Sequence, residues 1–69
     1  MTTDFPRNAR RALGISQLEF GKLVDVGLRQ VQRWERGERM RRLVVEEIWR
    51  HVDRKAAEKG MTREEFLAR

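Results

Sequence analysis

Residues 13–38 read LGISQLEFGKLVDVGLRQVQRWERGE, and this stretch carries the clearest local structure signals in the chain. Ser16 followed three residues later by Glu19 forms a capping box, which predicts a helix over residues 17–24. A second helix is expected over residues 28–36, because glycines directly before and after it can serve as its N-cap and its stop. The stretch therefore predicts two short helices joined by a turn of three residues.

The arginines of the second helix share one face. At 100° per residue, and with Val31 directed inward, Arg29, Arg33 and Arg36 lie about 140° to 200° away from the inward direction. Residues 28–42 contain six Arg and two Glu, a net charge of +4 out of +5 for the whole chain. The positive charge is therefore local, and it favours a polyanionic partner.

One helix is expected before this pair. Asp4, Phe5 and Pro6 form a helix start signal, since proline loses nothing at a first-turn position whose N–H has no partner. Gly14 is a stop signal. These signals predict a helix over residues 6–13.

Two further helices are expected after the pair. Apolar residues recur with helical spacing over residues 44–56, which predicts a helix of about 18 residues that ends before Gly60. Thr62 and Glu65 form a second capping box and predict a short helix over residues 63–68.

Length and composition favour one small domain. The 69 residues lack the alternating pattern of strands, so we expect an all-α, compact bundle of about five helices, with residues 1–69 as a single domain. The absence of cysteine excludes disulfides and thiolate zinc sites. No apolar run approaches the roughly 18 residues of a membrane span, so we expect a cytoplasmic protein with no membrane contact.

A helix with outward arginines suits the major groove of B-DNA, which is wide enough for one α-helix. The guanidinium groups of Arg29 and Arg33 can each donate two hydrogen bonds to guanine. Leu28, at the tip of this helix, either packs against a thymine methyl group or enters the core. The remaining arginines of this region are better placed for phosphates, which set the register without specifying sequence: Arg36, Arg39, Arg41 and Arg42.

These residues resemble the helix-turn-helix of the lambda-type phage repressors and Cro proteins, the Xre family. The resemblance covers Arg10 to about Arg42. It rests on the Ser-Gln pair that begins the first helix of the motif, on the small residue where the two helices touch, and on the centre and end of the second helix: Ser16, Gln17, Gly21, Val31, Trp34, Glu35, Arg36 and Gly37.

The resemblance implies roles for individual residues. Gln17 would contact a phosphate or brace the recognition helix, and Arg10 would form a partly buried, structural ion pair with Glu35. Four side chains of the recognition helix would face the bases: Leu28, Arg29, Gln32 and Arg33.

The sequence departs from the family pattern at two positions. Asp25 stands where the family has glycine in the turn, and Gly27 stands where it has a Ser or Thr cap. Asp tolerates the left-handed conformation and Gly is a fair N-cap, so we expect the motif to persist.

The leading hypothesis is a sequence-specific transcriptional regulator that binds DNA and acts as a repressor at an inverted-repeat operator. It would act as a homodimer whose half-sites lie roughly 10 bp apart, and it would be associated with the nucleoid. No catalysis is expected, because Ser16, the only serine, serves as a cap and the chain has no His-Glu-x-x-His motif or Gly-rich phosphate loop. No metal site is expected, because His51 is the only histidine, and no cofactor is expected.

The alternative is a protein-binding helical module, such as an antitoxin or an antirepressor. Its protein partner would be held by helices four and five through an apolar set that exceeds what one small core absorbs: Trp49, Val52, Met61, Phe66 and Leu67. Homodimerisation would account for the same surplus.

Overall fold

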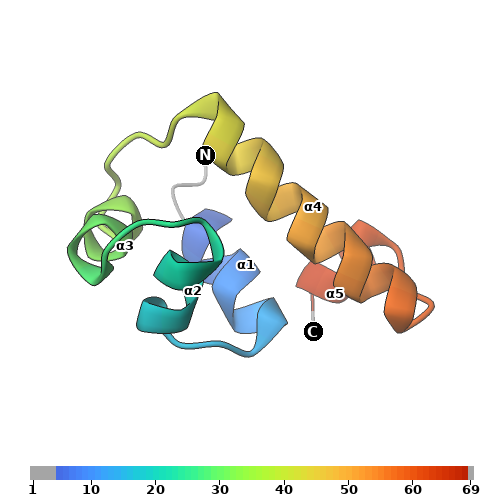
Figure 1. Cartoon of the computed structure of the whole chain (residues 1–69). Coiled ribbons are helices and arrows are strands. Elements are labelled where there is room, and N and C mark those ends of the chain that lie inside the picture. Colours follow the sequence, from blue (N-terminus) through green and yellow to red (C-terminus); the bar gives the residue numbers. More distant parts are fainter. Residues whose placement is uncertain (1–4, 69) are drawn as a thin grey trace.

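The computed structural model describes residues 5–68, which form five α-helices and no strand (Figure 1). The all-α prediction is confirmed, and the helix bounds lie within one or two residues of those expected. Asp4, which belongs to the predicted start signal, lies outside the described residues. The helices are α1 (Phe5–Leu13), α2 (Gln17–Leu23), α3 (Leu28–Glu35), α4 (Arg42–Glu58) and α5 (Arg63–Leu67).

Two capping boxes fix where α2 and α5 begin. The Ser16 hydroxyl accepts a hydrogen bond from the Glu19 backbone N–H at 3.1 Å, and the Glu19 carboxylate accepts one from the Ser16 N–H at 2.8 Å. Thr62 and Glu65 make the same two bonds, at 3.1 and 2.9 Å. Both predicted boxes are therefore confirmed, and each such cap contributes about 1 kcal/mol to helix stability.

The turn between α2 and α3 is tight because Asp25 adopts a left-handed conformation, with φ of 59°. A hydrogen bond of 2.8 Å from the Val26 N–H to the Gly21 carbonyl closes the turn. Gly27 follows as the N-cap of α3 and has no side chain to bond the free N–H groups of the first turn. Both departures from the family pattern are thus accommodated by the backbone.

Gly21 allows α2 and α3 to touch. A Cβ atom at this position would lie 2.6 Å from the Val26 carbonyl oxygen and 3.3 Å from the Val31 Cγ2. Contacts this short cannot be relieved by moving a flexible side chain, because the nearer atom belongs to the backbone. The crossing of the two helices therefore requires glycine here.

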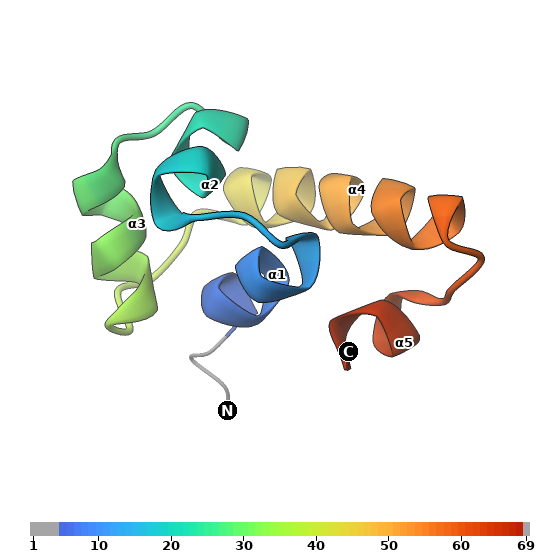
Figure 2. The ribbon, with the colours of Figure 1, turned by 90° about the horizontal axis from the view of Figure 1, so that it is seen from below.

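All five helices contribute to one hydrophobic core. Helix α1 lies in the middle and contacts α3, α4 and α5, while α2 packs on α3 (Figure 2). The outer face of α3 remains free at one end of the molecule. None of the helices within residues 5–68 is long and apolar enough to cross a bilayer. The buried residues are Ala9, Phe20, Val24, Val31, Trp34, Ile48, Val52, Ala56 and Phe66.

Helix α5 is fastened to α4 by Arg63. Its guanidinium donates to both carboxylate oxygens of Asp53, at 2.9 and 2.7 Å, and lies 4.1 Å above the centre of the Trp49 ring. The same tryptophan contacts Phe5 of α1, with 4.7 Å between ring centroids. These contacts connect the C-terminal helix to the start of the chain.

Replacing Gly21 by Ala is expected to reduce the free energy of unfolding by about 1–3 kcal/mol, because the added methyl group overpacks the contact between α2 and α3. Urea denaturation followed by circular dichroism measures the effect. Gly27→Ser is the control, since a Cβ meets nothing within 4 Å there and a serine can cap α3, so its stability should stay level or rise. A Gly21→Ala protein as stable as the wild type would contradict the close approach.

Candidate nucleic-acid interface

The carboxylate of Glu35, at the end of α3, is the meeting point of three helices. Arg10 of α1 donates to it from Nε at 2.7 Å and from Nη2 at 3.2 Å. Gln17 of α2 donates from Nε2 at 3.2 Å, and Arg7 of α1 from Nε at 3.4 Å. We call Arg7, Arg10, Gln17 and Glu35 the Glu35 cluster. Only 4% of the Glu35 side chain is exposed, so these contacts fix the orientation of α3.

Glu35 stays ionised despite its burial. Burial raises the pKa of Glu35, and this is the largest single effect. It is outweighed by the sum of four effects that lower the pKa: the hydrogen bonds from Arg10 and Gln17, the positive charge of Arg10 and the hydrogen bond from Arg7. The net result is a pKa below the ordinary value of 4.5. The cluster is therefore charged and fully bonded at neutral pH.

Only part of the Glu35 cluster could be predicted from the sequence. The family resemblance implies the pair of Arg10 and Glu35, and the structure shows it at 2.7 Å. For Gln17, the resemblance implies either a phosphate contact or a role in bracing the recognition helix. In the structure the Gln17 amide donates a hydrogen bond to the Glu35 carboxylate of α3, as the second role requires. Arg7 was missed, although its position one turn before Arg10 puts both side chains on one face of α1.

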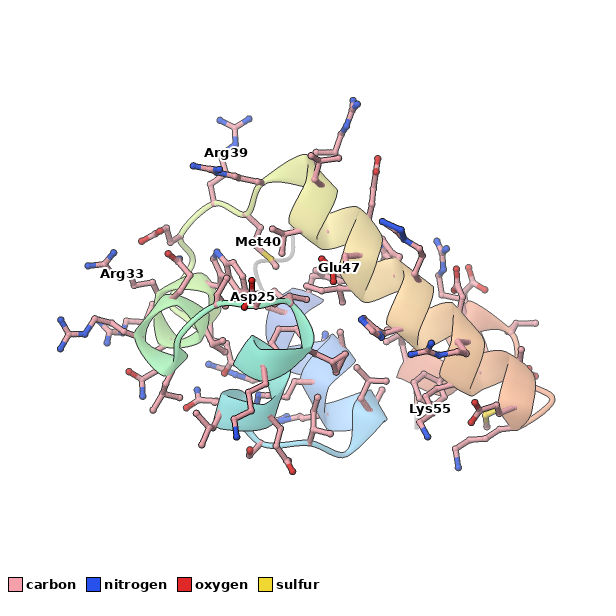
Figure 3. All side chains as sticks on the ribbon, in the orientation of Figure 1. Asp25, Arg33, Arg39, Met40, Glu47 and Lys55 are labelled. Atoms are coloured by element: carbon pink, nitrogen blue, oxygen red, sulfur yellow. The ribbon has the colours of Figure 1, made fainter. Side chains whose placement is uncertain are left out.

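The opposite face of α3 points away from the protein. Val31 and Trp34 are buried at 0% and 5% exposure, while Arg29 and Arg33 are exposed, and Figure 3 shows Arg33 extending outward. Leu28 is 39% exposed, so its side chain is not part of the core. Gln32 is half-buried at the edge of this face. The four predicted base-contacting residues thus lie together, from the tip of α3 along its outer side.

Positive charge continues from α3 into the loop before α4. We call five exposed residues of this region the arginine face, and within residues 5–68 their side chains form no hydrogen bond or ion pair. Arg42, the last of the predicted phosphate contacts, is exposed and lies 3.6 Å from the carboxylate of Glu46. The five residues are Arg29, Arg33, Arg36, Arg39 and Arg41.

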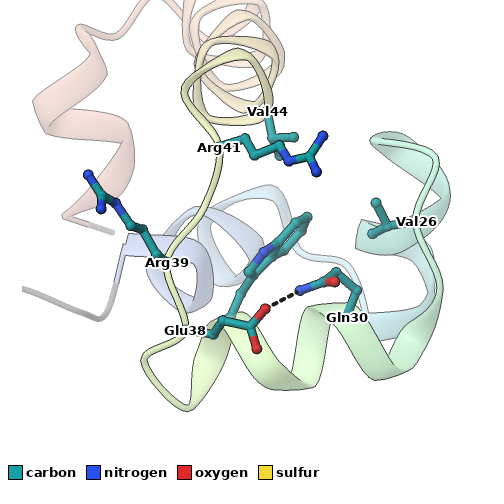
Figure 4. Close-up of a pocket in the computed structure, with 7 residues that line it drawn as sticks. Val26, Gln30, Glu38, Arg39, Arg41 and Val44 are labelled. Carbon is teal, nitrogen blue, oxygen red and sulfur yellow. Dashed lines mark hydrogen bonds between the residues drawn. The ribbon is translucent and has the colours of Figure 1, made fainter.

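The loop that follows α3 is held at one point. The Gln30 amide of α3 donates a hydrogen bond of 3.1 Å to the Glu38 carboxylate (Figure 4). This contact borders a hollow of about 300 Å³ between α3 and α4, with Arg39 and Arg41 among its lining residues. Glu38 bonds Gln30 and forms no ion pair with either arginine. The bond between Gln30 and Glu38 was not predicted from the sequence, because it depends on the path of the loop.

Comparison with known proteins agrees with this geometry. Residues 7–41 match the family model described as helix-turn-helix, and the chain belongs to this family of Xre and lambda-repressor type. The matched range begins at Arg7, the first residue of the Glu35 cluster, and ends at Arg41, the last residue of the arginine face. Neither the curated proteins nor the solved structures contain a match to the chain. The family is a DNA-binding one, and the chain is accordingly a DNA-binding regulator of the Xre type.

The Glu35 cluster predicts a specific acid sensitivity. Because the folded-state pKa of Glu35 lies below 4.5, its carboxylate stabilises the fold above that pH, and this stabilisation is lost as the pH falls through the folded-state pKa. Glu35→Gln should lower the free energy of unfolding at pH 7 by about 1–3 kcal/mol and weaken the decline in stability below pH 4.5. Urea denaturation at a series of pH values measures both effects.

The control is Glu46→Gln, which removes only the exposed partner of Arg42. It should leave the pH dependence of the wild type nearly unchanged. If Glu35→Gln and the wild type lose stability in parallel on acidification, Glu35 is not the acid-sensitive group.

Proposed function

We propose that this protein is a sequence-specific transcriptional regulator that inserts α3 into the major groove of DNA. One observation supports it most. The Arg7 and Arg10 guanidiniums bind Glu35, Arg63 binds Asp53, and the five guanidiniums of the arginine face form no such contact within residues 5–68. A duplex with phosphates on its rim and guanine acceptors in its groove supplies the missing partners.

The arrangement divides the proposed contacts into two kinds. Arg29 and Arg33 lie one turn apart on the outermost side of α3, where a planar guanidinium can bond guanine O6 and N7. The exposed Leu28 methyl groups suit a thymine methyl, and Gln32 suits a base edge. Four arginines beside them are proposed to bind phosphates and to orient α3 in the groove: Arg36, Arg39, Arg41 and Arg42.

We further propose that the active species is a homodimer that represses from an inverted repeat. A single α3 of eight residues reaches only a few base pairs, which is too short a sequence to be distinctive in a genome. Two copies related by a two-fold axis would place two such helices in successive major grooves, about one helical turn apart. A dimer seated there would block other proteins from the same DNA.

The protein-binding module is less well supported as an alternative. The apolar set expected to hold a partner is largely taken into the core, since Val52 and Phe66 are 0% and 1% exposed. Trp49, Met61 and Leu67 are half-buried against the same core. A large apolar surface of α4 and α5 is therefore not left for an antitoxin-like or antirepressor-like contact.

Selection of duplexes from a random pool at about 150 mM salt, where non-specific binding is weak, tests the proposed function. The wild type should enrich a two-fold symmetric site that contains guanine. Arg33→Ala should relax the preference at one base pair of each half-site, with a loss of roughly 1–3 kcal/mol for that base.

Arg41→Ala is the matched comparison, because it removes the same charge from a proposed phosphate contact. It should weaken binding to all sequences alike and reduce the slope of log affinity against log salt by about one unit per subunit. If Arg33→Ala keeps the wild-type sequence preference, or if no site is enriched, the proposal fails.

A further inference from the structure

A second basic site lies at the end of the molecule away from α3. A hollow of about 400 Å³ opens between the last turn of α1, the last turn of α4 and α5. Three cationic side chains line it, Arg11, Lys55 and Lys59, together with the apolar side chains of Leu13 and Phe66. No acidic residue is among its lining residues. We call it the basic hollow.

Two of these cations stand out within residues 5–68. Outside the arginine face, most basic side chains form a hydrogen bond or an ion pair or interact electrostatically with a nearby titratable group. Lys22, for example, is close enough to Glu19 for its charge to lower the pKa of that carboxyl group. Lys55 lies 3.6 Å from the Glu58 carboxylate. Arg11 and Lys59 have no side-chain interaction of these kinds. Both line the same hollow, so two cations without a carboxylate partner lie together there, beside the C-terminal ends of α1 and α4.

The cations are not needed to complete the helix ends beside the hollow. At the end of α1, the Gly14 and Ile15 N–H groups bond the carbonyls of Arg11 and Arg10, at 3.0 and 3.3 Å. At the end of α4, the Gly60 and Met61 N–H groups bond the carbonyls of residues 57 and 56, at 3.1 and 2.8 Å. These four carbonyl groups are therefore bonded by the backbone, and the cations interact with the helix ends through the partial negative charge there, which leaves their N–H groups available to a ligand.

We propose that the basic hollow binds a small phosphate monoester that carries an apolar group. A phosphate monoester has a charge near −2 at neutral pH, which matches the two unpaired cations, Arg11 and Lys59. Its apolar group would lie on the half-buried side chains of Ala12 and Leu13, and Lys55 would add a third charged contact. The volume of the hollow is at the lower end of the range for small-molecule sites.

The surroundings favour a compact ligand over an acidic protein segment. Glu58 on α4 and Glu64 and Glu65 on α5 are exposed and belong to the elements that border the hollow. An extended acidic partner would be repelled by these carboxylates, whereas a compact anion would meet only the three lining cations.

The basic hollow and the arginine face occupy different parts of the molecule. In Figure 2, α3 lies at one end, while α5 and the last turn of α4 lie at the other. The ligand would therefore bind without covering the proposed DNA contacts, and loss of one site should leave the other intact. This separation makes the proposal testable independently of DNA binding.

Titration of ¹⁵N-labelled protein with phenyl phosphate, followed by amide chemical shifts, tests the proposal. We expect saturable shifts that centre on residues 11–14, 55–59 and 66. Inorganic phosphate, which lacks the ring, and phenylacetate, which has a single charge, should each bind more weakly. The double variant Arg11→Gln/Lys59→Gln should raise the dissociation constant by about tenfold or more.

The control is Arg50→Gln, which removes one exposed charge from α4 away from the hollow and should bind phenyl phosphate like the wild type. Thermal denaturation checks folding, and the double variant should keep a cooperative transition that is lowered by no more than several degrees, because it removes one cation from each of two helix C-terminal ends. Shifts confined to residues 29–41, unchanged binding by the double variant, or no saturable shift would overturn the proposal. So would binding of an acidic peptide such as Phe-Glu-Glu with no binding of phenyl phosphate.

Discussion

The bonding of Glu35 determines the orientation of α3, and the proposed interface depends on it. Successive side chains on a helix are rotated by 100°, so a Glu35 carboxylate directed inward also determines the direction of its neighbours. Arg10 and Gln17 hold that carboxylate from two different helices, at 2.7 and 3.2 Å. Arg33 is consequently presented to solvent, and the proposed recognition surface takes its orientation from contacts within the protein.

A second constraint is the distance between α2 and α3. There is no room for a side chain at position 21, where the two helices touch. Asp25 takes a left-handed conformation in the short turn that connects α2 to α3. The Glu35 cluster and this turn act together, because the first sets the rotation of α3 and the second sets its position on α2. Positive charge then gathers on the face that neither constraint uses.

Local features of the sequence predicted the helices well. Capping boxes depend on residues three apart, so Ser16 with Glu19 and Thr62 with Glu65 could be recognised directly. The helical period predicted the outward direction of Arg33, because a residue two positions after an inward-facing Val31 points to the opposite side of the helix. The convergence of Arg7 on Glu35, 28 residues away, and the basic hollow could not be predicted, since both depend on how distant segments pack. The exposure of Leu28 also needed the structure, because its wheel position borders the buried face.

The proposed bond between Arg33 and guanine is tested most directly by replacing single guanines with 7-deazaguanine in the duplex that the protein selects. This change removes the N7 acceptor from the major groove and leaves base pairing intact. If Arg33 bonds guanine there, the substitution should weaken wild-type binding by about tenfold at one position of each half-site and have no further effect on Arg33→Ala. No loss of affinity at any guanine, or an equal loss in the wild type and in Arg33→Ala, would contradict an arginine face that specifies sequence.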